Sequence, residues 1–278
     1  MKTWRLGRCG VAIATLAAVS AAEAALLDYD GFDYPGQTTI GGLAGGIGWG
    51  GAWVNTTGEP ALTGDGQSLE SAPFPFTPVG ERLRRVQGTT GDRAAIRDLS
   101  QPFDLAGDGV LYASTLVRRG DDGDAISASD MQFQFRTNGG TIGFRFGVSA
   151  ADVFFVGANA VDTNSGAVPI VEDTVYFLVV KIVSSAAGSD EVFMNVYAPG
   201  DTVPQSEPGS WDLATSGARN DLITQLRINI GTNNSYGEID EIRIGTDWAS
   251  VAVPEPASLA VMGVGALAVR AVRRRRRC

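Results

Sequence analysis

Residues 238–243, EIDEIR, place several charged side chains on one predicted strand near the end of the chain. Alternation along a strand puts Glu238 and Asp240 on the same face, and two carboxylates on one face can act as nucleophile and acid/base across a glycosidic bond. Glu241 lies at odd spacing from Glu238, so it points to the opposite face unless a β-bulge intervenes. A hydrolytic site is therefore one reading of this stretch, and we interpret it instead as a solvated or salt-bridged strand.

A second group of carboxylates lies around residue 30. Asp28, Asp30 and Asp33 fall within six residues, and Asp240 or Asp247 would approach them if the first and last strands were neighbours. Carboxylate and carbonyl oxygens are the hard ligands that suit Ca²⁺, although no EF-hand spacing is present. The candidate cofactor is therefore a structural calcium ion, with Asp28, Asp30 and Asp240 as its candidate ligands.

Aromatic side chains are the candidate platforms for sugar rings. Trp49 and Trp53 lie in or beside the glycine-rich stretch 41–51, where small neighbours would let a ligand or another backbone approach. Buried packing is the alternative for both indoles. Trp248 follows the last predicted strand and is expected to close the core. Trp49 and Trp53 are therefore the candidate glycan-binding residues.

The composition excludes several kinds of chemistry. The chain of 278 residues contains no histidine, and its two cysteines, Cys9 and Cys278, lie near its ends. Ser-His-Asp catalysis and histidine zinc sites are therefore excluded, as are disulfides and thiolate metal sites within the body. Carboxylate chemistry, calcium bound by oxygen, and binding through aromatic or polar surfaces remain.

The N-terminal residues 1–24 have the three parts of a secretory signal. Three cations precede an apolar run from Gly10 to about Val19, and small residues follow at Ala22 and Ala24. We predict cleavage near Ala24 or Ala25 and export through the secretion translocon.

The C-terminal residues 253–278 combine an extended Pro-containing linker, an apolar segment and a basic cluster. The uninterrupted apolar run 257–269 has 13 residues, so as a helix it spans about 20 Å against a hydrocarbon core of about 30 Å. A helix over 257–272 would require Arg270 to extend its side chain to the interface. A temporary span with its basic end in the cytoplasm is the prediction. The flanking cations are Arg270, Arg273, Arg274, Arg275, Arg276 and Arg277.

The body between these two ends is strongly acidic. The whole chain carries a net charge of −9, and without residues 1–25 and 253–278 the remaining 13 cations and 29 anions give −16. An acidic body argues against nucleic acid as a partner, because phosphate binding needs clustered Lys and Arg. The pairs Arg84-Arg85 and Arg118-Arg119 are interpreted as surface charges.

Apolar alternation in the body predicts a single all-β domain over residues 25–252. Residues 131–136 and 142–148 alternate on either side of Asn138-Gly139, which is typical of a β-hairpin. Residues 174–183 and 191–199 are predicted to form a second pair, and 222–231 and 238–245 a third. No stretch shows a sustained helical period, and 41–51 is predicted to be a loop. Two antiparallel sheets packed face to face would bury the alternating sets, giving a β-sandwich.

The tail resembles a PEP-CTERM sorting signal, since a Pro-Glu-Pro motif, a short apolar helix and an arginine cluster follow one another. The motif residues are Val253, Pro254, Glu255 and Pro256. This resemblance implies processing by an exosortase during transient association with the inner membrane of a Gram-negative bacterium that makes extracellular polysaccharide. It also implies a final location at the cell surface or in the extracellular matrix.

The body resembles the concanavalin A-like, LamG-like sandwiches in the stretches LLDYDGFDYP, GGIGWGGAW and IDEIRIGTDWASV. The resemblance implies a jelly roll in which the first and last strands lie side by side. Retaining glucanases of this fold use Glu-x-Asp-x-x-Glu on one strand; here Glu238 and Asp240 fit, but Arg243 stands at the third position, so the acid/base is missing. The fold also serves lectins, adhesion modules and lyases, so it does not determine activity.

The expected protein is a non-catalytic, exported component of the cell envelope or extracellular matrix, with polysaccharide as its candidate ligand. A hydrolase or lyase acting on polysaccharide is one alternative. A purely structural or adhesive module without a defined ligand is the other.

Overall fold

The structure is a computed structural model that describes residues 25–34, 39–56, 62–64, 66–69, 74, 78–85, 93–120, 130–158, 161–231 and 236–253. The predicted signal peptide, residues 1–24, lies outside the described residues. So does the tail from Pro254 onward, including the predicted helix 257–272 and the arginine cluster 273–277. Among the residues described, no helix is long and apolar enough to cross a membrane.

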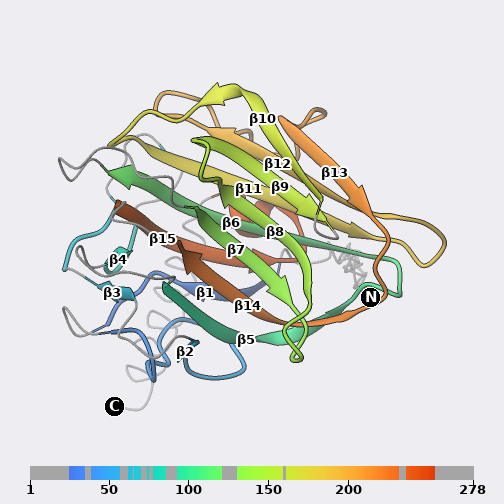
Figure 1. The fold of residues 1–278 in the computed structure, drawn as a ribbon, viewed down its shortest axis with the longest axis horizontal. Coiled ribbons are helices and arrows are strands. Elements are labelled where there is room, and N and C mark those ends of the chain that lie inside the picture. The colour runs from blue at the N-terminus through green and yellow to red at the C-terminus, as the bar shows by residue number, and fades with distance from the viewer. Residues whose placement is uncertain are drawn as a thin grey trace, which may run out of the picture.

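Two antiparallel sheets face each other, as Figure 1 shows, so the expected β-sandwich is confirmed. Sheet A runs in the order β13 (Leu213–Gly217), β12 (Asp190–Tyr197), β11 (Val175–Ser184), β6 (Gly109–Gly120), β15 (Tyr236–Gly245), β4 (Leu83–Arg85) and β3 (Leu62–Gly64), with β1 (Leu26–Asp30) also beside β15. Sheet B runs in the order β10 (Val161–Pro169), β9 (Val153–Ala158), β8 (Ile142–Val148), β7 (Met131–Arg136), β14 (Leu222–Ile230), β5 (Arg93–Asp104) and β2 (Val54–Asn55).

The main core lies between the two sheets and is built from the predicted alternation. Phe133 on β7 faces Phe146 on β8 in the hairpin register, and their rings stack with centroids 4.8 Å apart. Both side chains are buried, and burial of such apolar surface is the main favourable term in folding. The hairpin predicted around Asn138-Gly139 is confirmed, as is the antiparallel pair of β11 and β12.

The third predicted pair is wrong in its pairing, although both strands exist. β14 lies in sheet B between β7 and β5, whereas β15 lies in sheet A between β6 and β4. The connection between them therefore crosses from one sheet to the other. Period-two alternation predicts that one face of a strand is buried, but it does not say in which sheet.

The first and last strands are neighbours, as the resemblance implied. β1 pairs antiparallel with β15, with Asp28 opposite Ile244 and Asp30 opposite Ile242. On its other side, β15 pairs with β6 through a β-bulge between Asp240 and Arg243. Residues 41–51 form no strand, as predicted. The pairing of β1 and β15 therefore brings the acidic stretch around residue 30 next to the acidic stretch 238–243.

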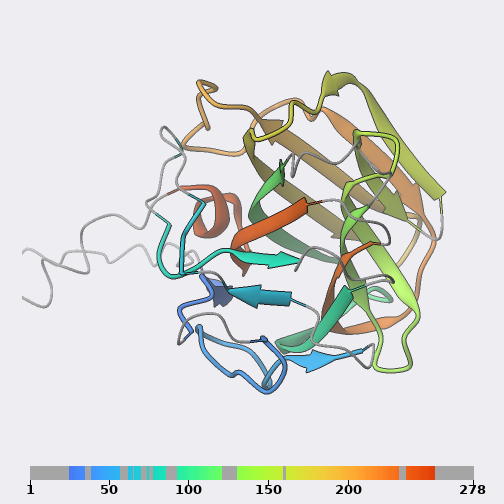
Figure 2. The ribbon, with the colours of Figure 1, turned by 60° about the vertical axis from the view of Figure 1, so that its left-hand side comes forward.

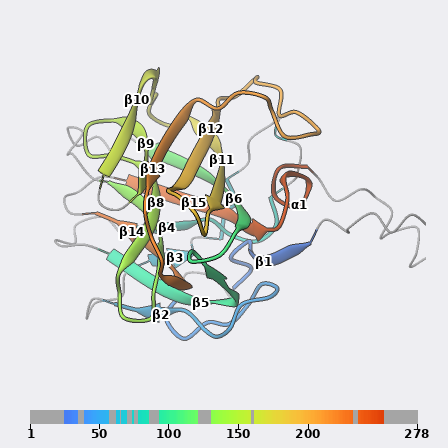
Figure 3. The same ribbon diagram turned by 90° about the vertical axis from the view of Figure 1, so that its right-hand side faces the viewer.

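A second apolar cluster covers the outer face of sheet A. The helix α1 (Trp248–Ala252) packs there with Trp248 and Val251 buried. The β3–β4 loop, of which the structure describes residues 66–69, 74 and 78–82, adds Leu69 and Phe74. The ring centroid of Phe74 lies 5.7 Å from that of Phe177 on β11. Figure 2 shows α1 and the cyan and teal segments around β3 and β4 on the same side of the sandwich. In Figure 3, α1 lies outside β6, on the side away from β8 and β14.

Candidate functional site

A cavity lies where the β3–β4 loop crosses the outer face of sheet A. Its volume is about 550 Å³, within the range of roughly 300–1,000 Å³ that is usual for small-molecule sites. Among the described residues, the loop supplies six of the lining residues and the sheet supplies Arg118 and Val175. The lining residues are Gly66, Gln67, Ser68, Leu69, Gly80, Arg82, Arg118 and Val175.

Glu238 forms an ion-paired layer with two of the lining arginines. Its side chain has no exposed surface; Arg82 Nε lies 3.1 Å from Oε1, and Arg118 Nε donates a hydrogen bond to Oε2. The backbone register also sets Glu238 between Arg84 on β4 and Arg118 on β6. A buried charge is tolerated only when it is paired, so these arginines fix Glu238 against the cavity.

Asp240 lies two residues further along β15 and fastens the loop to the sheet. Its Oδ2 accepts hydrogen bonds from the Ser68 hydroxyl at 2.8 Å and the Leu69 N–H at 2.9 Å, and its Oδ1 accepts one from the Glu241 N–H at 2.8 Å. Burial raises the pKa of this carboxyl to about 7, opposed by the hydrogen bonds from Leu69 and Ser68. At neutral pH Asp240 therefore carries only part of a negative charge.

The β-bulge changes the expected direction of Glu241. Glu241 has φ of 53°, a left-handed conformation that costs a non-glycine residue energy. Its Oε1 accepts hydrogen bonds from the Val79 N–H at 2.7 Å and the Tyr29 hydroxyl at 2.9 Å, and Arg243 donates to its Oε2 at 2.9 Å. Glu241 thus contacts the same β3–β4 loop as Asp240. Without the β-bulge, the alternation along β15 would have pointed its side chain to the opposite face.

The three carboxylates of β15 are therefore loop anchors rather than exposed groups. Glu238, Asp240 and Glu241 all have an exposed fraction of 0%. Their oxygens face arginines, hydroxyls and backbone N–H groups of the protein, which is the arrangement of a salt-bridged strand. The cavity above them is lined by the Gln67 amide, by the guanidinium groups of Arg82 and Arg118, and by the Ser68 hydroxyl, whose single proton is donated to Asp240.

The structure does not bring the three candidate calcium ligands together. Asp28 and Asp30 point into the sandwich, where the Ser100 N–H donates to Asp28 at 3.1 Å and Arg97 pairs with Asp30. Asp240 points to the opposite face of sheet A, toward Ser68. Within the described ranges, no group of three acidic side chains could hold a metal ion.

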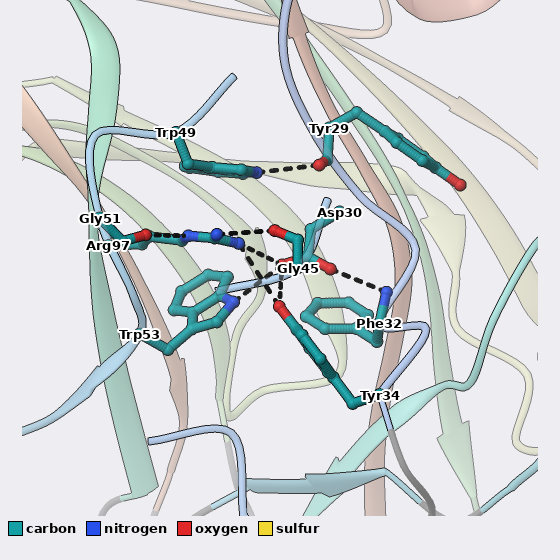
Figure 4. Close-up of polar contacts among 9 residues, drawn as sticks. All are labelled: Tyr29, Asp30, Phe32, Tyr34, Gly45, Trp49, Gly51, Trp53 and Arg97. Atoms are coloured by element: carbon teal, nitrogen blue, oxygen red, sulfur yellow. Dashed lines mark hydrogen bonds and ion pairs between the residues drawn. The ribbon is translucent and has the colours of Figure 1, made fainter. Parts of the chain in front are cut away.

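Asp30 is the centre of a buried polar cluster that Figure 4 shows in close-up. Its Oδ2 lies 2.5 Å from Arg97 Nη1 and accepts hydrogen bonds from the Tyr34 hydroxyl at 2.6 Å and Trp53 Nε1 at 2.8 Å. Arg97 also donates to the backbone carbonyls of Gly45 and Gly51. Burial and the nearby Asp30 charge raise the pKa of the Tyr34 hydroxyl, so Tyr34 stays protonated as a donor.

Trp49 and Trp53 belong to this cluster, which corrects their expected role. Trp49 is 8% exposed and Trp53 is 1% exposed. The Arg97 guanidinium carbon lies 4.9 Å from the Trp49 ring centroid and 5.5 Å from that of Trp53, within the range of cation–π attraction. Neither indole offers an open face to a sugar, so the structure assigns both residues to packing around Arg97.

The outer face of sheet B carries a second polar surface. The Gln134 amide donates to Gln132 at 2.8 Å, and Arg227 donates to Gln134 at 3.1 Å and to Asn229 at 3.2 Å. These side chains satisfy one another along the strands. We therefore place the candidate site at the cavity on sheet A.

Comparison with known proteins identifies the C-terminal signal. Residues 252–277 match the family described as the PEP-CTERM protein-sorting motif. The chain carries an exosortase sorting signal. The predicted export, with surface or extracellular localisation reached through the membrane, is thereby confirmed. No sequence among the curated proteins matches this chain significantly.

Several solved structures resemble the body at low identity. The endo-β-1,4-glucuronan lyase from the fungus Trichoderma reesei has 13% identity and a TM-score of 0.45, covering 77% of this chain and 96% of the lyase. The globular domain of T. cruzi calreticulin has 13% identity and a TM-score of 0.45, covering 70% and 84%. The Ca²⁺-bound VIP36 exoplasmic/lumenal domain has 11% identity and a TM-score of 0.40, covering 72% and 92%. Similarity at this level carries no argument about ligand or activity.

Sequence reasoning missed the residues that line the cavity. Gln67 and Ser68 lie in a loop without periodicity, so no pattern marked them. Arg118 was assigned with Arg119 to the surface, but consecutive strand residues point to opposite faces. Arg118 pairs with Glu238, whereas Arg119 is buried and pairs with Asp152 at the turn between β8 and β9. One signal was available in the sequence: Arg119 continues the alternation of buried apolar residues on β6, which indicates that it is buried.

Proposed function

We propose that this exported protein binds extracellular polysaccharide, without catalysis, in the cavity between the β3–β4 loop and sheet A. The sorting motif supports delivery to the surface or matrix, where polysaccharide is available. The cavity of about 550 Å³ is the observation that carries the binding proposal.

The chemistry of the lining suits a sugar. Leu69 and Val175 supply apolar surface for the C–H faces of a pyranose ring, while Gln67 and Arg118 supply polar groups for its oxygens. Ligand sites usually combine an apolar lining with a few convergent polar groups. Asp240 and Glu241 also anchor the described loop residues Leu69 and Val79 through their backbone N–H groups, which reduces the entropy that binding must overcome there.

The state of the carboxylates supports a binding role over a catalytic one. A glycosidase needs two carboxyl groups that reach the scissile bond. Glu238 and Asp240 have no exposed surface and are engaged by Arg82, Arg118 and Ser68. Arg243 occupies the position of the missing acid/base and pairs with Glu241.

Filling the cavity tests the binding proposal. Val175 is a buried lining residue, so Val175→Phe should occupy part of the space and abolish binding on a polysaccharide array. Val171 is 57% exposed and does not line the cavity, so Val171→Phe is the matched control and should bind as the wild type does. Thermal unfolding of both variants verifies that they are folded. A wild-type protein that binds no polysaccharide would instead favour a purely structural or adhesive module.

One observation favours the enzyme alternative. A carboxyl with a pKa of about 7 behind a cavity, as at Asp240, is a feature of general acids and bases. Incubation of the purified protein with polysaccharides, followed by assays for reducing ends and unsaturated products, tests this alternative. Turnover that disappears in Glu238→Gln and Asp240→Asn would establish hydrolase or lyase activity and overturn the non-catalytic proposal.

A further inference from the structure

The sorting motif begins inside the folded domain. The family match covers residues 252–277, whereas α1 runs from Trp248 to Ala252. Ala252 has an exposed fraction of 0%, and Val253 packs against the same apolar cluster on the outer face of sheet A. Ala252 and Val253 therefore belong both to the motif and to the domain.

Specific contacts hold α1 against the sheet. Trp248 and Val251 are buried, and the Trp248 indole donates a hydrogen bond to the Pro204 carbonyl at 2.9 Å. The Ser114 hydroxyl on β6 donates to the Val251 carbonyl at 2.7 Å, so the strand satisfies a backbone group at the end of the helix. In Figure 3, α1 lies beside β6 at the outer face of sheet A. The domain is thus fixed up to the point where the motif begins.

The helix is too short to persist away from this surface. α1 has five residues, and isolated helices of fewer than about 12 residues are marginal in water. Asp247 is its N-cap and accepts a hydrogen bond from the Ser250 N–H at 2.9 Å. Detachment from the sheet would cost the helix its form as well as its packing. α1 therefore has two states, one docked and helical and the other undocked and unfolded.

Access of a processing enzyme to a folded chain depends on local opening of this kind. Segments of a domain can open at a free energy well below that of global unfolding. Proteolysis then follows the population of the open form when opening and closing are fast compared with cleavage. In the docked state Ala252 is buried and the Val253 N–H donates to the Ala249 carbonyl at 3.3 Å. The backbone at the start of the motif is therefore engaged by the domain itself.

We propose that docked α1 shields the start of the sorting motif, and that the exosortase engages the whole motif only when α1 undocks. The helix is then an autoinhibitory contact that limits the rate of processing. The inference does not depend on the proposed binding of polysaccharide, because it concerns α1 and the motif and makes no use of the cavity.

The N-cap provides a matched pair of variants. Asp247→Ala removes the side-chain acceptor at the start of α1 and should raise the population of the undocked form about fivefold, whereas Asp247→Asn retains a capping side chain and should behave as the wild type does. The full-length chain is pulse-labelled in cells that contain the exosortase, and its intact mass is followed with time. Processing should be about fivefold faster in Asp247→Ala. Equal rates in all three proteins, or slower processing in Asp247→Ala, would overturn the inference.

A second pair of variants separates undocking of α1 from destabilisation of the sandwich. Ser114→Ala removes the hydrogen bond to the Val251 carbonyl, and Thr115→Val, at the next position of β6, removes a buried hydrogen bond within sheet A. In the purified unprocessed chain, the Ser250 and Val253 N–H groups should exchange with solvent faster in Ser114→Ala than in Thr115→Val. Only Ser114→Ala should also be processed faster in cells. Equal acceleration of processing in both variants would show that global unfolding controls access, and the inference would be wrong.

Discussion

The guanidinium of Arg97 on β5 lies 2.5 Å from the carboxylate of Asp30 on β1, so one buried ion pair joins sheet B to sheet A. Tyr34 and Trp53 donate to the same carboxylate, and Trp49 lies against the guanidinium. The pair thus organises the N-terminal segment around the end of the core. Its energetic role lies less in the attraction itself than in the cost of leaving either charge alone.

Removal of Asp30 should strongly destabilise the protein. Asp30→Ala leaves Arg97 buried without its counter-ion, and loss of one partner of a buried pair costs about 3–5 kcal/mol. Chemical denaturation gives the free energy of unfolding. Asp162→Ala is the control, because it breaks the more exposed Arg145–Asp162 pair, where about 0–1 kcal/mol is expected. Equal losses in the two variants would contradict a structural role for Asp30.

Trp53→Phe should lower stability without changing ligand binding. The substitution keeps an aromatic ring in the core but removes the N–H that donates to Asp30 at 2.8 Å, a loss of about 1–3 kcal/mol. Unfolding experiments and polysaccharide titrations on the same sample test both parts. Val175→Phe should instead lose polysaccharide binding and keep its stability. If Trp53→Phe has normal stability but no longer binds polysaccharide, Trp53 belongs to the ligand site.

Asp240 should make stability fall as the pH rises from about 4 to 7. Burial raises the pKa of its carboxyl from 3.8 to about 7, so the folded protein holds this proton more tightly than the unfolded chain does. The resulting stabilisation is fully present below about pH 4 and is lost as the pH approaches 7, by an amount on the order of a few kcal/mol. Denaturation at pH 4.5, 6 and 8 should therefore show a steeper decline in the wild type than in Asp240→Asn.

The comparison of slopes is the informative measurement. Asp240→Asn also alters hydrogen bonds to Ser68 and Leu69, so its absolute stability will differ at every pH. Only the titrating carboxyl makes the difference in the free energy of unfolding between the wild type and Asp240→Asn change between pH 4.5 and 8. Parallel curves would show that Asp240 titrates near its ordinary pKa.

Much of the sandwich was predictable because buried strands require alternation. The hairpin of β7 and β8 follows from apolar residues at every second position around Asn138-Gly139. The separation of β14 and β15 into different sheets did not follow, since alternation reports burial on one face only. The bulge at Glu241 was also beyond prediction, because one inserted residue leaves no periodic signal.

The candidate site was harder to predict than the fold. Arg97 occupies an inward position of β5, between the buried Ala95 and Leu99, which is a sequence signal for a buried counter-ion. Its partner Asp30 lies 67 residues away, and only the three-dimensional contact connects them. The cavity depends on loop residues that reach sheet A through tertiary contacts, such as the packing of Phe74 and the hydrogen bond from Leu69 to Asp240. Tertiary contacts of this kind leave no local pattern.

Removal of calcium should leave the thermal midpoint unchanged if the described side chains are the only candidates. Asp28 and Asp30 point into the core and Asp240 points to the outer face, and each has protein partners. Thermal unfolding with chelator and with added Ca²⁺ provides the measurement. A midpoint that rises with Ca²⁺ would demonstrate a folded-state site built from other residues.

Processing at the C-terminus should depend on the prolines that follow α1. Val253 has φ of −113° and ψ of 139°, the extended conformation expected before a proline, and it ends the helix directly at the surface of the domain. Replacing Pro254 and Pro256 with alanine would let the helix continue and alter the linker presented to the exosortase. Intact-mass analysis of protein from cells and medium should show a wild-type chain ending near Pro256, whereas the alanine variant should retain residues 273–278. A wild-type chain that retains the arginine cluster in both fractions would contradict removal of the tail.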